Sequence, residues 1–181
     1  MKNIIALVLA VLVTGCTSVP EGVKPVTGFE LSRYLGKWYE VARLPHSFEE
    51  DLQQVTADYR LKDDGGVRVL NRGFNVQTEQ WEQAEGKAYF VQSPDVGHLK
   101  VSFFGPFYGA YVIVELDKDH YRYALVSGPD REYLWILARE PQLDDGIKQS
   151  LVSKARQLGY ATEQLIWVQH SNDATAAKTN P

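Results

Sequence analysis

The sequence predicts an all-β protein: an eight-stranded antiparallel up-and-down β-barrel with one C-terminal α-helix packed on its outside. Short runs of alternating apolar and polar residues follow one another from Trp38 to Arg139, each bounded by Gly, Pro, Asp or Asn. The links between these runs are short, which favours pairing of neighbouring strands. Closing eight strands into a barrel removes the open edges that invite aggregation. A β-sandwich is the alternative, and it would need crossing connections between two sheets.

Composition limits the function classes. The chain has 181 residues, 44% hydrophobic and 12% aromatic, which is enough for one ordinary domain. With 19 basic and 23 acidic residues and no basic block, we expect no nucleic-acid partner. The single cysteine excludes an intrachain disulfide and a cysteine-based zinc site.

The first residues have the pattern of a targeting signal. Lys2 supplies a positive charge, and Ile4 to Val13 form an apolar run that is too short to span a membrane but suits a secretory signal. The run ends in Val13-Thr14-Gly15-Cys16, which resembles the lipobox of bacterial lipoproteins. The resemblance implies cleavage before Cys16 and attachment of a diacylglycerol to its sulfur. The alternative is an ordinary secretory signal with a chance cysteine.

These features predict four segments. Residues 1–15 are a lipoprotein signal peptide, 16–28 an acylated tether, 29–170 the barrel with its helix, and 171–181 a flexible tail. Because Thr17, not aspartate, follows the cysteine, the lipoprotein resemblance implies an anchor in the outer membrane that faces the periplasm.

The strands are expected in chain order. Trp38 to Leu44 is the first candidate, ended by Pro45, and the alternating run from Val55 to Lys62 is the second. Asp63 to Gly66 supplies a hairpin turn, because glycine accepts the positive φ of tight turns. The remaining candidates are Val67 to Arg72, Gln80–Gln92, Leu99–Phe104, Tyr111–Leu116, Tyr121–Ser127 and Tyr133–Arg139.

One helix follows the strands. Ile147, Leu151, Ala155 and Leu158 recur at helical spacing and give a single apolar face. Asp144 and Asp145 favour its N-terminus, and Gly159 is a natural C-terminal stop. Beyond it, Leu165 to Val168 form a short strand or extended segment.

Three motifs resemble the signatures of the lipocalin family. They are Arg33-Tyr34-Leu35-Gly36-Lys37-Trp38-Tyr39-Glu40, then Leu116-Asp117-Lys118 followed by Tyr123-Ala124-Leu125-Val126, and Trp135-Ile136-Leu137-Ala138-Arg139. With the lipobox, the chain is similar to the bacterial outer-membrane lipocalins and, through them, to apolipoprotein D. In the second motif only the aspartate of the family's T-D-Y remains. The resemblance implies that Gly36, Trp38 and Arg139 close one end of the barrel, with Arg139 stacked on Trp38.

The inward half of each strand supplies the candidate ligand contacts. If the predominantly apolar set of alternate residues on each strand faces inward, six side chains with polar tips or large rings point into the barrel. Such side chains are suited to grip an acyl chain and orient a head group. They are Tyr59, Asn71, Phe103, Tyr111, Tyr123 and Trp135. Trp135 matches a cavity tryptophan of the apolipoprotein D group. The alternative for each residue is that it fills a solid core.

Loop and buried polar residues give weaker indications. Phe107 and Tyr108, in the aromatic turn between the fifth and sixth strands, are expected to be exposed at the open end. Pro45 to Phe48 is a candidate lid, and Arg72 a candidate head-group ligand despite its outward parity. Glu40 is expected to point into the barrel near Trp38, where burial would raise its pKa.

The predicted function is binding rather than catalysis. The histidines have no metal-ligand spacing, no nucleophile elbow or phosphate loop is present, and we expect no catalytic residue, metal or cofactor. The expected ligand is a lipid such as a fatty acid or lysophospholipid, stored or transferred at the outer membrane by a protein that could form a homodimer. An enzyme on the same scaffold is the first alternative. A structural lipoprotein with a solid barrel is the second.

Overall fold

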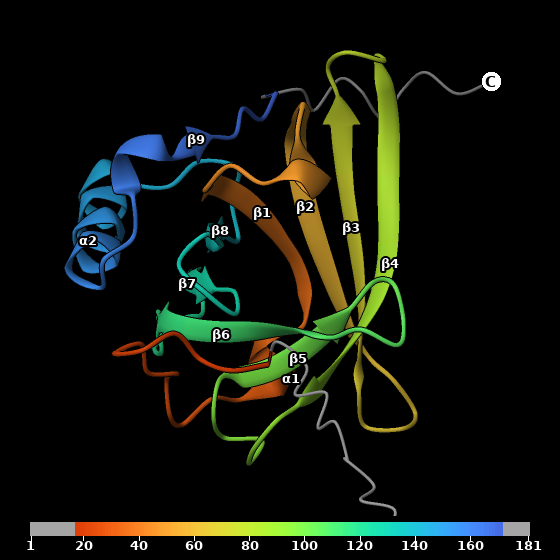
Figure 1. Ribbon diagram of the computed structural model, residues 1–181, viewed down its shortest axis with the longest axis vertical. Helices are drawn as coiled ribbons and strands as arrows, with labels where there is room; N and C mark the ends of the chain where they lie inside the picture. The colour runs from red at the N-terminus through yellow and green to blue at the C-terminus, as the bar shows by residue number, and fades with distance from the viewer. Residues whose placement is uncertain (1–16, 172–181) are drawn as a thin grey trace, which may run out of the picture.

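The protein is described here from a computed structural model that covers residues 17–171 (Figure 1). The predicted signal peptide, the lipidation of Cys16 and nearly all of the predicted tail lie outside these residues. The elements, in chain order, are α1 (Leu31–Tyr34), β1 (Gly36–Arg43), η1 (Ser47–Glu49), β2 (Leu52–Leu61), β3 (Val67–Asn75), β4 (Gln80–Phe90), β5 (His98–Ser102), β6 (Gly109–Leu116), β7 (Tyr123–Ser127), β8 (Leu134–Ala138), α2 (Asp145–Gln157), η2 (Thr162–Gln164) and β9 (Ile166–Trp167).

The strands form a closed antiparallel barrel, as predicted. Each strand from β2 to β8 pairs with its neighbour in sequence, and β1 pairs with both β8 and β2. Closure therefore satisfies the backbone of β1 on both sides. Every predicted strand is present, with ends that differ by no more than a few residues.

The barrel has a closed and an open end. Because neighbouring strands are antiparallel and β1 begins at the closed end, the loops after β1, β3, β5 and β7 all lie at the open end. The hairpin of β3 and β4 extends furthest at the open end (Figure 1). Only residues Lys87 to Phe90 of β4 pair with β5, so the part of β4 nearest the open end has no strand partner on that side.

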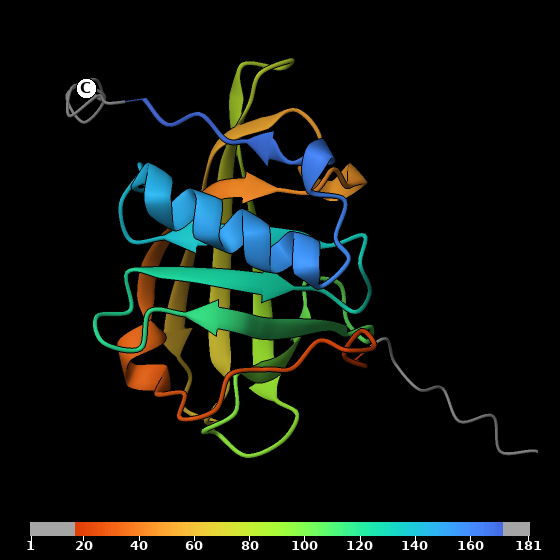
Figure 2. The ribbon, with the colours of Figure 1, turned by 90° about the vertical axis from the view of Figure 1, so that its left-hand side faces the viewer.

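The helix α2 lies across the outside of the barrel, also as predicted (Figure 2). The Asp144 side chain caps its N-terminus by accepting hydrogen bonds from the backbone N–H groups of Gly146 (2.8 Å) and Ile147 (3.2 Å). Gly159 adopts a φ of +86° just beyond its end, a conformation that favours glycine. Leu151 and Ala155 are buried against β6, β7 and β8.

Three short elements were not predicted as such. The four-residue helix α1 and the single turns η1 and η2 are too short to show a hydrophobic period. The predicted extended segment at Leu165 to Val168 is reduced to the two-residue strand β9, which pairs with Ala42 and Arg43 of β1. It occupies the edge of β1 that β2 leaves at the open end.

The apolar residues form two large clusters on opposite faces of the barrel wall. The inner cluster includes Trp38, Tyr59 and Val126, and the outer one lies between the wall and α2 and includes Leu125 and Ile136. Within residues 17–171, no helix combines the length and apolarity needed to span a bilayer.

Candidate functional site: the barrel cavity and its rim

A cavity of roughly 730 Å³ opens at the end of the barrel opposite α1. This volume lies within the range of small-molecule sites, about 300–1,000 Å³. Its lower wall is apolar, and its upper wall includes residues of the loops that follow β1, β5 and β7. Of the six predicted ligand residues, the structure brings together five on its lining: Tyr59, Asn71, Phe103, Tyr111 and Trp135.

The sixth, Tyr123, lies on the outside of the barrel wall, so the prediction that it faces the cavity is wrong. Tyr123 packs against the cluster under α2, while its neighbours Ala124 and Val126 point inward. The reason is that α2 covers β7, which makes the outer face of this strand as apolar as the inner one. Parity of apolar residues therefore cannot distinguish the two faces of β7.

Trp38 and Arg139 form the floor. Trp38 is fully buried and donates from Nε1 to the carbonyl oxygen of Tyr34 at 2.8 Å. The Arg139 guanidinium lies 4.0 Å from the centre of the Trp38 indole, as the family resemblance implied. It also donates to the carbonyl oxygens of Lys37 (2.8 Å) and Arg33 (2.7 Å). Gly36, with a φ of +90°, turns the chain into β1 beside this arginine.

Three tyrosine hydroxyls are linked above the floor. Tyr111 Oη lies 2.7 Å from Tyr34 Oη and 2.8 Å from Tyr59 Oη. Burial raises the pKa of all three phenols, so they are neutral and each carries its proton. Two hydrogen bonds use two of the three protons, and the third remains available to an acceptor on a ligand.

A buried charged cluster joins the first loop to the cavity wall. Arg43 donates to Glu40 Oε1 at 2.8 Å and to the carbonyl oxygen of Glu49 at 2.6 Å. Trp135 Nε1 donates to Glu49 Oε2 at 3.1 Å, and His46 Nε2 lies 2.9 Å from the same oxygen. The cluster fixes η1, and with it Phe48, over one side of the open end.

Burial raises the pKa of Glu40 well above its ordinary value, and the negative charge of Glu49 adds to this effect. Arg43 opposes the shift without cancelling it. The prediction that Glu40 points into the barrel with a raised pKa is thus confirmed. Its partner Glu49 was missed, because a loop residue outside any periodic pattern gives no signal of burial. Tyr34 was missed as a cavity residue because it lies on the unpredicted helix α1.

The rim of the open end is aromatic and exposed. We call aromatic rim the five large apolar side chains that project from the open-end loops and the β3–β4 hairpin: Phe48, Val76, Trp81, Phe104 and Phe107. Phe104 and Phe107 are 79% and 77% exposed and also line the cavity. The prediction of exposure is confirmed for Phe107 but wrong for Tyr108, which is half-buried near Lys100.

The two remaining polar candidates, Arg72 and Asn71, differ in their surroundings. The Arg72 guanidinium stacks 4.2 Å from the centre of the Trp81 ring at the rim. Asn71 Oδ1 is buried in the cavity without a hydrogen-bond partner. Among residues 17–171, no three His, Cys, Asp or Glu side chains form a group that could hold a metal ion.

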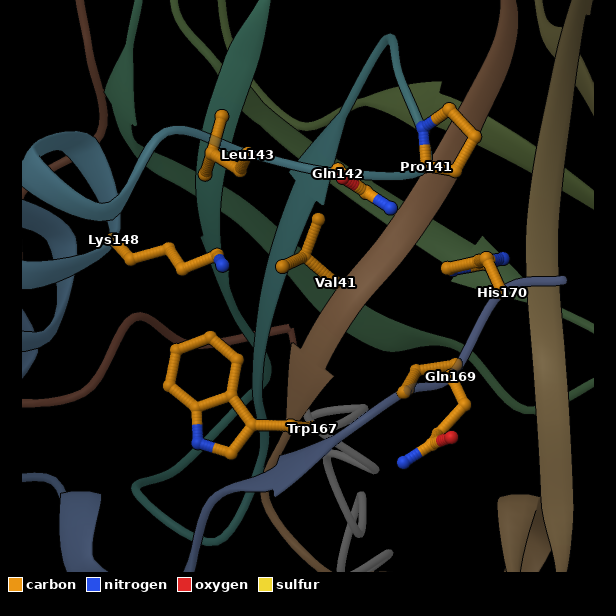
Figure 3. Close-up of a pocket in the computed structure, with 9 residues that line it drawn as sticks. Val41, Pro141, Gln142, Leu143, Lys148, Trp167, Gln169 and His170 are labelled. Carbon is orange, nitrogen blue, oxygen red and sulfur yellow. The ribbon is translucent and has the colours of Figure 1, made fainter. Parts of the chain in front are cut away.

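A second hollow, of roughly 380 Å³, lies on the outside of the barrel, between α2, β9 and the segment after β8 (Figure 3). Trp167 and Lys148 line one side of it, with the Lys148 ammonium 5.9 Å from the indole centre. This hollow has no connection to the predicted site residues.

Comparisons with known proteins agree with this architecture. The Lipocalin-like domain family matches residues 29–170. The chain is 55% identical to "Outer membrane lipoprotein Blc" of Vibrio cholerae serotype O1, over 93% of this chain and 99% of that protein. It is 51% identical to the protein of the same name from Escherichia coli strain K12, over 91% of this chain and 93% of that protein.

More distant proteins share the fold. Apolipoprotein D of Rattus norvegicus is 33% identical over 64% of this chain and 63% of its own length. Insecticyanin from the tobacco hornworm Manduca sexta superposes with a TM-score of 0.67 at 22% identity, covering 86% of this chain and 88% of that one. The family match over most of the chain, together with relatives above 50% identity, shows that this chain belongs to the lipocalin family.

Proposed function

We propose that this lipocalin binds a single-chain lipid, such as a fatty acid or lysophospholipid, and stores or transfers it at the outer membrane. The observation that carries the proposal is the apolar cavity of roughly 730 Å³ that opens at the aromatic rim. A cavity of this size also argues against the alternative of a solid structural barrel. Burial of an acyl chain supplies affinity at roughly 0.8 kcal/mol per CH₂ group.

The polar groups of the cavity limit where a head group can lie. The negative charge of Glu49 disfavours a carboxylate or phosphate beside it. The hydroxyls of Tyr34, Tyr59 and Tyr111 offer a free proton to a carboxylate or ester oxygen. A negative group therefore belongs at these tyrosines or outside, near Arg72 at the rim.

The location follows from the proposed anchor. Acylation of Cys16 would hold the protein at a membrane, since two or more acyl chains anchor stably whereas one does not. Relatives that cover nearly the whole chain are named outer membrane lipoproteins. Thr17 after the cysteine supports the outer membrane, with the barrel in the periplasm.

Native mass spectrometry of the protein purified from its own host tests the proposal, with isothermal titration of fatty acids of increasing length as the second measurement. We expect a co-purifying lipid and an affinity that rises with acyl length until the cavity is full. An empty barrel whose affinity does not depend on acyl length would contradict lipid binding.

One observation favours an enzyme as the second candidate. Glu40 and Glu49 form a buried acid pair that faces the cavity, and such a pair can serve general acid–base chemistry. Incubation with lysophospholipids and fatty-acid esters, followed by mass spectrometry of the products, separates the two. Turnover that is lost in the Glu40→Gln and Glu49→Gln variants would support the enzyme; unchanged lipid recovered from the protein supports the binder.

A further inference from the structure

Three buried tyrosine hydroxyls form a polar patch at the deep end of the cavity. Tyr34 comes from α1, Tyr59 from β2 and Tyr111 from β6, and all three line the cavity. We call these three side chains the tyrosine cluster. The ring of Tyr34 lies against the floor, with its centre 4.6 Å from that of Trp38. An acyl chain that is inserted down to the floor therefore brings its far end to these hydroxyls.

The wall beside the tyrosine cluster is apolar. Val67 and Val69 of β3, Ala88 of β4 and Leu99 of β5 are buried in the same inner cluster and line the cavity. Polar groups in such surroundings are costly unless they are hydrogen-bonded. The hydrogen bonds of the three phenols therefore limit what the deep end can bind.

These hydrogen bonds leave one position open. Tyr111 Oη lies 2.7 Å from Tyr34 Oη and 2.8 Å from Tyr59 Oη, so the two outer oxygens are at most about 5.5 Å apart. Within residues 17–171, these are the only hydrogen bonds of the three hydroxyls. Burial raises the pKa of all three phenols, so three protons are present for two bonds. If both bonds run in one direction, one end of the chain has an unused proton and the other an oxygen that accepts none.

A hydroxyl group on a ligand fits this open position. A hydroxyl donates one proton and can accept another, so it can close the three phenols into a ring of four hydrogen bonds. The oxygens of Tyr34 and Tyr59 are close enough for one ligand oxygen to lie within hydrogen-bond distance of both. In this ring every proton is used and every oxygen accepts one, which satisfies the requirement of buried polar groups.

A carboxylate fits the same position less well. It only accepts, and its two oxygens require several donors, whereas the tyrosine cluster has one unused proton. Besides burial, the negative charge of Glu49 raises the pKa of Tyr59, so Glu49 would also repel a carboxylate placed there. The positive charge of Arg139 lowers the pKa of Tyr59 by less than Glu49 raises it. Of the two positions left to a negative head group, the open end is therefore the better one.

We propose that the tyrosine cluster is a subsite for a hydroxyl group on the acyl chain, and that the cavity takes lipids whose chain is hydroxylated near its far end. The inference rests on the proposed function and names the class of lipid. A plain chain leaves the unused phenol proton without an acceptor, whereas a hydroxylated chain provides one. The hydroxyl lies near the far end of the chain because the tyrosine cluster lies at the floor.

Isothermal titration with pairs of fatty acids tests the assignment. The two acids of a pair have the same length, about 10 to 16 carbons, and differ in ending with a methyl group or with a hydroxyl, which should weaken binding about tenfold where it is buried without a partner. We expect this penalty at most lengths, and its disappearance at the length that brings the hydroxyl to the tyrosine cluster. A penalty that persists at every length would overturn the proposal.

Two variants test which side chains are responsible. Tyr34→Phe and Tyr59→Phe each remove one of the two hydroxyls that the ligand bridges. Each should weaken binding of the matched hydroxy acid about tenfold and change binding of the plain acid by less than about twofold. Tyr123→Phe is the matched control, because Tyr123 lies on the outside of the wall and should change neither. Thermal unfolding verifies that the variants are folded, and either of the first two is sufficient for the comparison.

The outcomes distinguish this inference from the proposed function. If no acid of any pair binds, lipid binding itself fails and the subsite fails with it. If both variants weaken the plain acid as much as the hydroxy acid, a carboxylate occupies the floor and only the hydroxyl subsite fails. Unchanged affinity for the hydroxy acid in Tyr34→Phe and Tyr59→Phe would overturn the subsite as well, while leaving lipid binding in place.

Discussion

At the scale of single residues, the floor of the barrel depends on one stacked pair. Arg139 covers the indole of Trp38 and at the same time donates to the carbonyl oxygens of Lys37 and Arg33. Lysine could replace the charge but not the planar fork that makes these contacts together. The pair thus closes one end of the cavity and leaves the other as the entrance.

Replacing Trp38 with alanine should lower the free energy of unfolding by about 3–5 kcal/mol, because it leaves a large cavity in the inner core. Urea denaturation followed by far-UV circular dichroism measures this change. Trp167→Ala is the control: Trp167 is 45% exposed, so its loss should have a much smaller effect. An equal loss of stability in both variants would refute the role of Trp38 as the floor.

At the scale of elements, α2 determines which faces of the strands are apolar. It covers β7 and β8, so that Leu125, Leu134 and Ile136 are fully buried on the outside of the wall. The same strands bury Val126 and Leu137 on the inside. A strand with two apolar faces has no usable alternation, which is why Tyr123 was placed on the wrong side, whereas Tyr59 on the uncovered strand β2 was placed correctly.

The helix itself depends on its N-cap. Asp144→Ala removes the side chain that accepts from the backbone of Gly146 and Ile147, and should cost about 1 kcal/mol of stability. Ser153→Ala, on the exposed face of the same helix, should change stability by less than about 0.5 kcal/mol. Thermal unfolding of both variants checks the difference, and a cap variant as stable as the unsubstituted protein would show that α2 does not need Asp144.

At the scale of the whole molecule, the buried charged cluster of Glu40, Arg43 and Glu49 connects the first loop to the barrel. This cluster also makes the stability of the protein depend on pH. The pKa of Glu40 is raised in the folded protein, so the folded state holds its proton more tightly than the unfolded state. The stabilisation from this proton is complete below the ordinary pKa of about 4.5 and is lost as pH rises through the raised value.

Glu40→Gln, which stays neutral, should therefore lose less stability than the unsubstituted protein as pH rises from about 4.5 to 8. Urea denaturation across this range measures the two curves. His170 has a lowered pKa from burial and acts in the opposite direction, but it does so in both proteins and largely cancels in the difference. Glu132→Gln, at an exposed site, should leave the curve unchanged. Parallel curves for Glu40→Gln and the unsubstituted protein would contradict the assignment.

Local patterns in the amino-acid sequence were enough to predict the barrel, its order of strands, its outer helix and the stacked floor. These follow from local information: the period of apolar residues, glycines at turns, an aspartate before a helix, and three motifs shared with lipocalins. Five of the six residues placed on the cavity followed from the same alternation.

Features that depend on contacts between distant segments became visible only in the folded protein. The link from Tyr34 through Tyr111 to Tyr59 joins α1, β6 and β2, and the cluster of Glu40, Glu49 and Trp135 joins β1, η1 and β8. The apolar outer face of β7 exists because α2 folds back over it, and the aromatic rim exists because the β1–β2, β3–β4 and β5–β6 connections meet at one end. Alternation along a strand indicates that a side chain is buried. Whether that side chain faces the inside of the barrel or the layer beneath α2 is decided only when the barrel closes and α2 packs against it.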